Sequence, residues 1–522
     1  MQVALYDTTL RDGAQQEGVS FSLPDKVKIA RQLDALGVHY VEGGWPGSNP
    51  KDAGFFQIMC ENPLSHAVVT AFGSTRRASL RAEDDPNLRA LIACGAPAVA
   101  LVGKSSDLHA REVLGVSLEE NLSMIADSVA YMIAQGKKVF FDAEHFFDGY
   151  AANPEYALRT LEAAADAGAS VLVLCDTNGG MMPADLVEAI QAVQRATTTP
   201  LGIHCHNDAE LAVANTLLAV EAGVTQVQGT VNGYGERCGN ANLCTLIPNL
   251  KLKLGHDCVT DEQLQGISGL AHLVSELANL SPNPHQPYVG HSAFAHKGGT
   301  HVNALMKCPD SYQHIDPGLV GNSQRVIISE LSGKSNIEHK INEFRLAWTP
   351  TREQTQMVLR EVKSLEGRGF QFEGAEGSVE LLLQRTRKDY VRPFKLVDFH
   401  VLVTTGRDGG MSSEATVKVK VHDELIHTAA DGNGPVNALD KAVRKALLPF
   451  FPGLANVYLT DYKVRILDGD SATGAQTRVL ISSANGHTSW TTVGSSANII
   501  EASWMALADS LEYALLNGAG KK

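Results

Sequence analysis

The chain has 522 residues, which is too long for one ordinary hydrophobic core, so two or three domains are expected. Its hydrophobic content of 44% and charged content of 20% are typical of a soluble globular protein, and its net charge of −14 argues against nucleic acid or an anionic membrane as a partner. No apolar run could cross a bilayer and no export signal follows Met1. The eight cysteines are scattered without a Cys-x-x-Cys pair, as suits a reducing cytoplasm.

Up to about residue 255, short apolar strands alternate with amphipathic helical patterns. The predicted strands are Val3–Asp7, Tyr40–Gly43, Ala67–Phe72, Ala98–Val102, Val139–Asp142, Val171–Cys175, Leu201–His204 and Gln226–Val231. Helical patterns include Pro24–Leu36, Leu118–Ala134, Pro154–Ala167, Pro183–Ala196 and Leu211–Ala222. Glycines follow several of these helices, because glycine can adopt the left-handed backbone conformation that often ends a helix. Eight such units in roughly 250 residues favour an α/β fold of the (β/α)8 barrel type over a doubly wound open sheet.

The seventh predicted strand ends in His204 and His206, with Cys205 between them. Side chains two residues apart in a strand share a face, so both imidazoles would point to one place while Cys205 packs on the other side. Two such imidazoles can bind one divalent metal ion, although a pair of hydrogen-bonded core histidines is the alternative.

Further polar groups follow the ends of other strands, where barrel enzymes carry their chemistry. Closure of a barrel places strands seven, eight and one side by side. Asp12, after strand one, could therefore meet His204, His206 and a residue of the glycine-rich loop Asn232–Asn242 at one point. The glycines of that loop could instead cradle a phosphate, or they could bring Asn240 inward. This convergence favours a metal site.

After the predicted barrel, prolines at 282, 284 and 287 indicate a linker. The segment His291–Asn303 has three histidines beside glycines, which favours an active-site loop over a packed helix. A solvated loop with incidental histidines is the alternative. From about Lys395 a β-rich domain contains two ββα-type copies, in which Asn437 and Asn498 correspond. We interpret the repeat as a sensing or dimerising module, with a structural appendage as the alternative. The expected domains are a barrel at 1–280, helical linker subdomains at 281–394 and a regulatory domain at 395–522.

Three motifs, Asp7–Gly13, His204–Asp208 and Gly233–Asn240, resemble the signatures of the isopropylmalate, homocitrate and citramalate synthase family, in the wider group of barrel metalloenzymes that includes hydroxymethylglutaryl-CoA lyase. The segment Gly43–Asp52 is similar to the citramalate synthase branch. One difference is that His301 is followed by Val-Asn, where the family often has Gln-Asp. The resemblance implies condensation of acetyl-CoA with a 2-oxo acid and hydrolysis of the thioester. Pyruvate is the oxo acid expected for this branch, and the bulkier 2-oxoisovalerate of an isopropylmalate synthase is the alternative.

The resemblance also implies roles for individual residues. The metal ligands would be Asp12, His204, His206 and Asn240, a set that suits Zn, Mn, Co or Mg. Arg11 would bind substrate and stabilise the developing oxyanion. His301 would be the base, assisted by Glu144. The remaining expectations are Thr177 for the oxo acid carboxylate, Tyr312 at the thioester, a homodimer, and feedback by isoleucine through the C-terminal repeat. A related C–C lyase and a non-catalytic amino-acid-binding regulator are the other classes considered.

Overall fold

The computed structural model describes residues 2–405, 410–468 and 474–519. The chain divides into two compact units: Met1–Phe294 with Ile315–Ser323, and Ala295–His314 with Gln324–Lys522. Within the described residues, none of the helices combines the length and the apolar character needed to span a bilayer.

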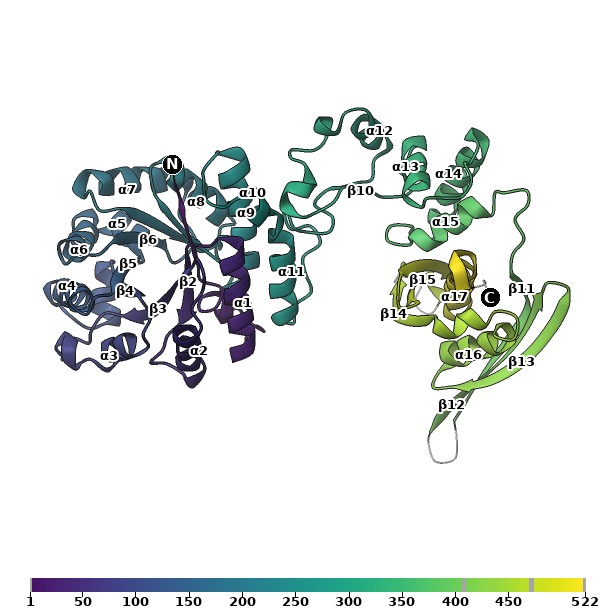
Figure 1. Cartoon of the computed structure of the whole chain (residues 1–522), viewed down its shortest axis with the longest axis horizontal. Coiled ribbons are helices and arrows are strands. Elements are labelled where there is room, and N and C mark those ends of the chain that lie inside the picture. The colour runs from purple at the N-terminus through teal and green to yellow at the C-terminus, as the bar shows by residue number, and fades with distance from the viewer. Residues whose placement is uncertain (1, 406–409, 469–473, 520–522) are drawn as a thin grey trace. The chain divides into compact units, whose positions relative to one another are not determined.

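The first unit is a closed barrel of eight parallel strands in sequence order (Figure 1). The strands are β1 Ala4–Asp7, β2 Tyr40–Gly44, β3 Val68–Ser74, β4 Ala98–Lys104, β5 Lys138–Glu144, β6 Val171–Asp176, β7 Leu201–Cys205 and β8 Gln226–Gly229. β8 pairs with β1 and with β7, so the predicted barrel and the predicted proximity of strands seven, eight and one are confirmed. β8 ends two residues earlier than expected, because Thr230 Oγ1 donates a hydrogen bond to Tyr234 O in a turn.

Helices surround the barrel (Figure 1). They are α1 Leu23–Leu36, α2 Pro50–Glu61, α3 Pro86–Ala93, α4 Leu118–Ala134, α5 Phe146–Ala152, α6 Pro154–Asp166, α7 Pro183–Ala196, α8 Ala212–Glu221, α9 Leu243–Pro248, α10 Asp261–Gln265 and α11 Ile267–Leu277. Local signals set their ends. Ser22 and Asp25 form a capping box at the start of α1, and Gly37 ends that helix at φ 88°, in the left-handed region.

Alternation along the strands separates two apolar regions. In β6, Val173 and Cys175 belong to a small cluster with Tyr6 and Phe140, whereas Leu172 and Leu174 belong to the large core between strands and helices. Cys205 of β7 also belongs to the large core, whereas His204 pairs in register with Cys175. Side chains directly opposite in paired strands share a face, so His204 points into the barrel and Cys205 packs outward, as predicted.

The second unit begins with two short strands and several helices: β9 Ala295–His296, α12 Gly299–Lys307, β10 Arg325–Val326, α13 Lys334–Glu343, α14 Arg352–Glu366 and α15 Glu376–Gln384. The prediction of a loop rather than a packed helix through Asn303 is wrong, because α12 begins at Gly299. Val302 and Leu305 lie one turn apart in that helix and are both buried. The apolar spacing of this short helix therefore outweighs its polar composition.

The C-terminal repeat follows in the same unit. Its first copy is β11 Phe394–Thr405, β12 Met411–Val421, β13 Glu424–Gly432 and α16 Pro435–Leu447, and its second is β14 Tyr458–Ile466, β15 Thr477–Ala484, β16 Ser489–Ser496 and α17 Ile499–Ala514. Each copy is a three-stranded antiparallel sheet followed by a helix, so the repeated motif is βββα rather than the predicted ββα. The strand β14 lies at a sheet edge with most side chains exposed, and it therefore lacks the alternation that indicates a half-buried strand.

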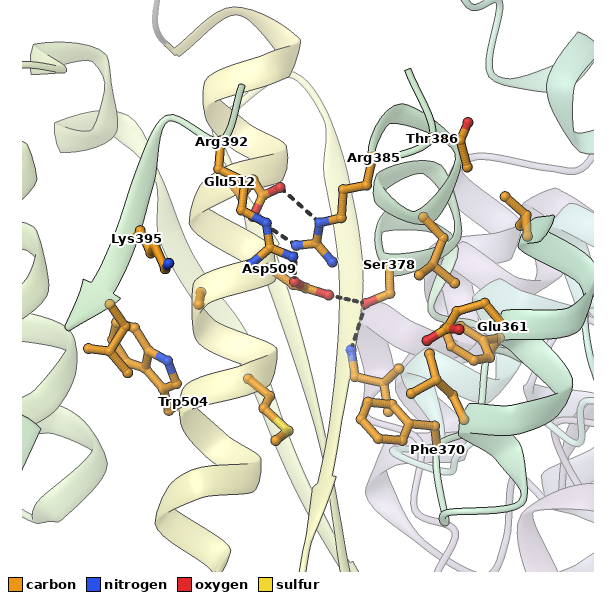
Figure 2. A pocket seen from close by; sticks show the side chains of 18 of the residues that line it. Glu361, Phe370, Ser378, Arg385, Thr386, Arg392, Lys395, Trp504, Asp509 and Glu512 are labelled. Atoms are coloured by element: carbon orange, nitrogen blue, oxygen red, sulfur yellow. Dashed lines mark hydrogen bonds and ion pairs between the residues drawn. The ribbon is translucent and has the colours of Figure 1, made fainter. Parts of the chain in front are cut away.

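An ion cluster joins α15 to α17 within this unit (Figure 2). Arg385, at the end of α15, donates to Glu512 Oε2 at 2.7 Å and also pairs with Asp509. Tyr390 donates to the same Glu512 carboxylate. A cavity of about 530 Å³ lies beside the cluster, lined by side chains of α14, α15, β11 and α17.

Candidate active site

A cavity of about 580 Å³ opens at the carboxyl ends of the barrel strands. Six of the nine predicted site residues line it: Arg11, Asp12, Glu144, Thr177, His204 and His206. The apolar side chains of Trp45, Phe72 and Val102 line other parts of it. The barrel therefore gathers side chains from several separate strand ends around one cavity.

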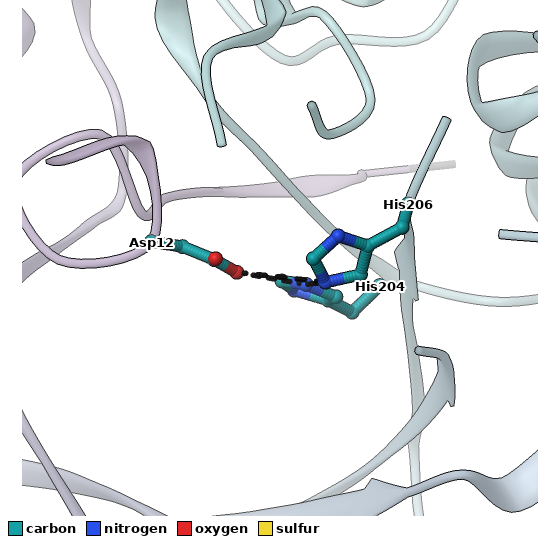
Figure 3. Close-up of side chains that lie close together, drawn as sticks. All are labelled: Asp12, His204 and His206. Atoms are coloured by element: carbon teal, nitrogen blue, oxygen red, sulfur yellow. Dashed lines mark hydrogen bonds and ion pairs between the residues drawn. The ribbon is translucent and has the colours of Figure 1, made fainter. Parts of the chain in front are cut away.

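Asp12, His204 and His206 form a tight buried cluster (Figure 3). His204 Nε2 lies 3.1 Å from Asp12 Oδ2 and 3.4 Å from His206 Nε2, and His206 Nε2 lies 3.9 Å from Asp12 Oδ2. Two donors that bind one Zn²⁺ tetrahedrally, each at about 2.1 Å, are themselves about 3.4 Å apart. The spacing of the three donor atoms therefore suits a single divalent cation.

The charges around this cluster shift its pKa values strongly. Burial opposes ionisation of Asp12, but Arg11 and the hydrogen bond from His204 hold the pKa of that carboxyl well below its usual range. The hydrogen bond to Asp12 and its charge raise the pKa of His204 in spite of burial. Burial and the charge of His204 lower the pKa of His206 to about 4. Asp12 is thus an anion and His206 a neutral imidazole at neutral pH, which are the forms that bind metal.

Asn240 lies next to the cluster on the glycine-rich loop. It pairs with His206 in an isolated antiparallel bridge, and its Nδ2 donates to Tyr234 O at 3.1 Å. Its buried Oδ1 has no hydrogen-bond partner among the described residues. The loop can fold this closely because Gly239 has φ 88°, where a Cβ would lie 1.9 Å from Gly233 O. A buried amide oxygen without a partner, on the residue that pairs with His206, suits a fourth ligand.

Arg11 is held by a carboxylate that the sequence analysis did not identify. Its guanidinium pairs with fully buried Glu42 of β2, which also accepts a 2.7 Å hydrogen bond from Tyr6 Oη. The guanidinium also lies 3.9 Å from the ring centroid of Phe72. These contacts fix a permanent cation beside Asp12, since Arg11 Nη1 is 3.5 Å from Asp12 Oδ2.

Glu144 and Thr177 lie on the neighbouring strand ends. Glu144 ends β5 and forms an ion pair with Lys104, which ends β4 in register with it. Thr177 follows β6, and its Oγ1 accepts a 2.8 Å hydrogen bond from the backbone N–H of His145. A hydroxyl that accepts one hydrogen bond can still donate its own proton, and Thr177 lines the cavity.

The two other predicted residues, His301 and Tyr312, belong to the second unit. His301 lies in α12, and its ring stacks on that of Tyr312 with the centroids 4.3 Å apart. The structure thus brings this pair together. The roles of His301 and Tyr312 in catalysis stay predictions.

Glu42, Lys104, Asp142 and Gln228 are polar residues near this site that the sequence analysis did not single out. Glu42, Asp142 and Gln228 are buried within strands. One signal could have found them, because a charged or amide residue within an apolar strand is rare and needs a partner. Only the fold shows which partner each of them has.

Three models of known protein families match consecutive parts of the chain. Residues 2–274 match the family described as HMGL-like, residues 288–369 match the homocitrate synthase post-HMGL domain, and residues 373–515 match the LeuA allosteric (dimerisation) domain. The barrel and these matches define the class: an HMGL-like barrel enzyme with a LeuA-type C-terminal domain.

Full-length relatives narrow this class. The chain is 54% identical to an (R)-citramalate synthase of Geobacter sulfurreducens over 98% of this chain and 97% of the relative, and 43% identical to one of Sulfolobus acidocaldarius over 98% and 97%. A 2-isopropylmalate synthase of Methanocaldococcus jannaschii is 29% identical over 98% and 95%. The chain belongs to the (R)-citramalate synthase family.

Proposed function

We propose that the chain condenses acetyl-CoA with pyruvate and hydrolyses the thioester, giving (R)-citramalate and CoA. The new C–C bond joins the acetyl methyl carbon to the keto carbon of pyruvate; a methyl C–H bond and the π bond of the ketone break, and the keto oxygen gains a proton to become a hydroxyl. Water then breaks the C–S bond, supplying OH to the new carboxyl and a proton to the thiol. The observation that carries the proposal is the buried Asp12–His204–His206 cluster at the barrel cavity, with Arg11 beside it.

Asp12, His204, His206 and Asn240 would hold a divalent metal ion. The donor spacing and the orphaned Asn240 Oδ1 support this set, which does not choose among Zn, Mn, Co and Mg. When bound, the ion would polarise the keto carbonyl of the oxo acid.

The protein's own side chains would supply the other functions. Arg11 stabilises the charge that develops on the keto oxygen, and Glu42 holds its guanidinium in place. The Thr177 hydroxyl donates to the carboxylate of the oxo acid. His301 removes a proton from the acetyl methyl group, assisted by Glu144, and Tyr312 acts at the thioester.

The direct test is release of CoA thiol from acetyl-CoA against a panel of 2-oxo acids, with and without a chelator. Pyruvate should give the highest kcat/KM, and chelation followed by metal replacement should abolish and restore turnover. A preference for 2-oxoisovalerate would instead indicate 2-isopropylmalate synthesis. His204→Ala should lose both metal and activity, and an active, metal-replete variant would overturn the ligand set.

We also propose that the C-terminal repeat forms a homodimer and binds isoleucine as a feedback effector. The match to the LeuA allosteric (dimerisation) domain supports a dimerising and allosteric role, and the choice of isoleucine is based on the resemblance to citramalate synthases. The reaction is expected to be a committed biosynthetic step, for which feedback control is suited. Inhibition by isoleucine that persists after deletion of 395–522 would contradict the regulatory assignment.

The proposed compartment is the reducing cytoplasm, which the eight free cysteines support.

A further inference from the structure

A fully buried amide, Gln228, contacts the ring of His204 on the nitrogen that the cluster does not use. β7 and β8 pair so that His204 lies beside Gln228, and Gln228 Oε1 is 2.9 Å from His204 Nδ1. The other nitrogen, Nε2, is the one that lies 3.1 Å from Asp12 Oδ2. The imidazole therefore has an amide at one nitrogen and the cluster at the other.

Two acceptors hold the amide of Gln228 in one orientation. Its Nε2 donates to Asp142 Oδ1 at 3.4 Å and to Gln226 Oε1 at 3.5 Å. If the amide were flipped, its oxygen would face two other oxygens and its NH2 would face His204. Gln228 Oε1 therefore faces His204. Because an amide oxygen only accepts, His204 Nδ1 must carry the proton of this hydrogen bond.

We propose that Gln228 is a positioning residue for His204: in the metal-bound protein it would hold the tautomer in which Nδ1 is protonated and the Nε2 lone pair faces the metal ion. The inference rests on the metal site of the proposed function. Histidines that bind metals usually donate their second ring N–H to an acceptor, and loss of that acceptor typically weakens metal binding by about 10–100-fold. Gln228 has the geometry of such an acceptor, and Asp142 and Gln226 support it in turn.

The test is titration of metal-free full-length protein with Co²⁺, followed by the visible absorption of the bound ion. Gln228→Met keeps the length of the side chain but removes the acceptor, and should weaken Co²⁺ binding by about 10–100-fold. Gln228→Glu restores an acceptor at Nδ1 and should bind within about threefold of wild type or more tightly. Weakened binding in Gln228→Met that Gln228→Glu does not rescue would overturn the proposal, as would wild-type affinity in Gln228→Met.

Asn121→Leu is the matched control, since it removes another fully buried barrel amide, bonded to Lys104 O and Tyr156 Oη. It should lower thermal stability without changing Co²⁺ affinity, and equal weakening of Co²⁺ binding in both variants would assign the effect to packing alone.

If Gln228→Met does not fold, ¹⁵N-histidine NMR of the Zn²⁺-loaded wild type decides, with the signals of His204 assigned by comparison with His204→Ala. A protonated Nδ1 is expected, and a metal-bound Nδ1 would overturn the proposal. Absence of Co²⁺ binding in the wild type would instead refute the proposed metal site.

Discussion

The side chains of Lys104 and Glu144 form an ion pair between the ends of β4 and β5. Both residues line the barrel cavity. The ammonium group therefore fixes the carboxylate that we propose to assist the base. We expect Lys104→Met to lower kcat/KM by about 100-fold, because displacement of a catalytic group by about 1 Å costs that much. Steady-state kinetics with metal content measured in parallel would check this.

Lys138→Met is the control for that variant. Lys138 lies at the other end of β5, where its Nζ is 2.7 Å from Tyr40 Oη. Its removal should leave both kcat and metal content unchanged. If Lys104→Met is as active as Lys138→Met, Glu144 needs no partner for its role.

The guanidinium of Arg11 is the permanent cation beside the cluster, so its loss should affect the transition state more than the ground state. We expect Arg11→Leu to lower kcat by about 10²–10³-fold, the usual effect of removing one group that stabilises an oxyanion. Metal content should stay normal, because Arg11 is not a ligand. Glu42→Gln should give a smaller decrease, since the guanidinium remains but loses its charged partner. A kcat within about threefold of wild type in Arg11→Leu would contradict the assigned role.

Asp7 gives a prediction about pH and stability. Burial raises the pKa of Asp7 from 3.8 to about 7, although hydrogen bonds from Thr9 oppose the shift. Because the folded pKa is raised, the folded state holds a proton that the unfolded state has lost between about pH 4 and 7. The contribution of Asp7 to the free energy of unfolding is therefore complete below about pH 4 and is lost as the pH rises through 7. Between these two values the free energy of unfolding falls by about 1.4 kcal/mol per pH unit.

Asp7→Asn keeps an acceptor for Thr9 but cannot ionise. Its melting temperature relative to wild type should therefore be higher at pH 8 than at pH 5, with both proteins at the same metal concentration. An equal difference at the two pH values would show that Asp7 does not titrate in this range.

The metal cluster illustrates what local pattern can predict. His204 and His206 stand two residues apart in an apolar strand, and barrel closure alone brings Asp12 to them, so the sequence contains that information. Glu42 and Gln228 are different, since their importance lies in partners 31 and 24 residues away. No periodicity encodes such a pairing, because it depends on the register between strands.

The second unit was harder to predict for two physical reasons. Exposed edge strands such as β14 bury neither face, so apolar and polar residues do not alternate along them. The short helix α12 buries few side chains, and its histidines and glycines resemble a loop. The repeat was visible because similar Gly/Ser-rich segments precede α16 and α17, but the predicted correspondence of Asn437 and Asn498 is wrong: Asn437 is the third residue of α16, whereas Asn498 is the N-cap of α17.

Arg385 forms ion pairs with both Asp509 and Glu512 between α15 and α17. We expect Arg385→Met to destabilise the second unit by about 3–5 kcal/mol, because it removes the ion-pair partner of Asp509 and of the buried Glu512. Urea unfolding followed by tryptophan fluorescence would measure this. Arg387→Met is the control, since its pair with exposed Asp389 should contribute at most about 1 kcal/mol. Adding Asp509→Asn and Glu512→Gln to Arg385→Met should recover much of the loss. No recovery would show that Arg385 acts through its packing rather than its charge.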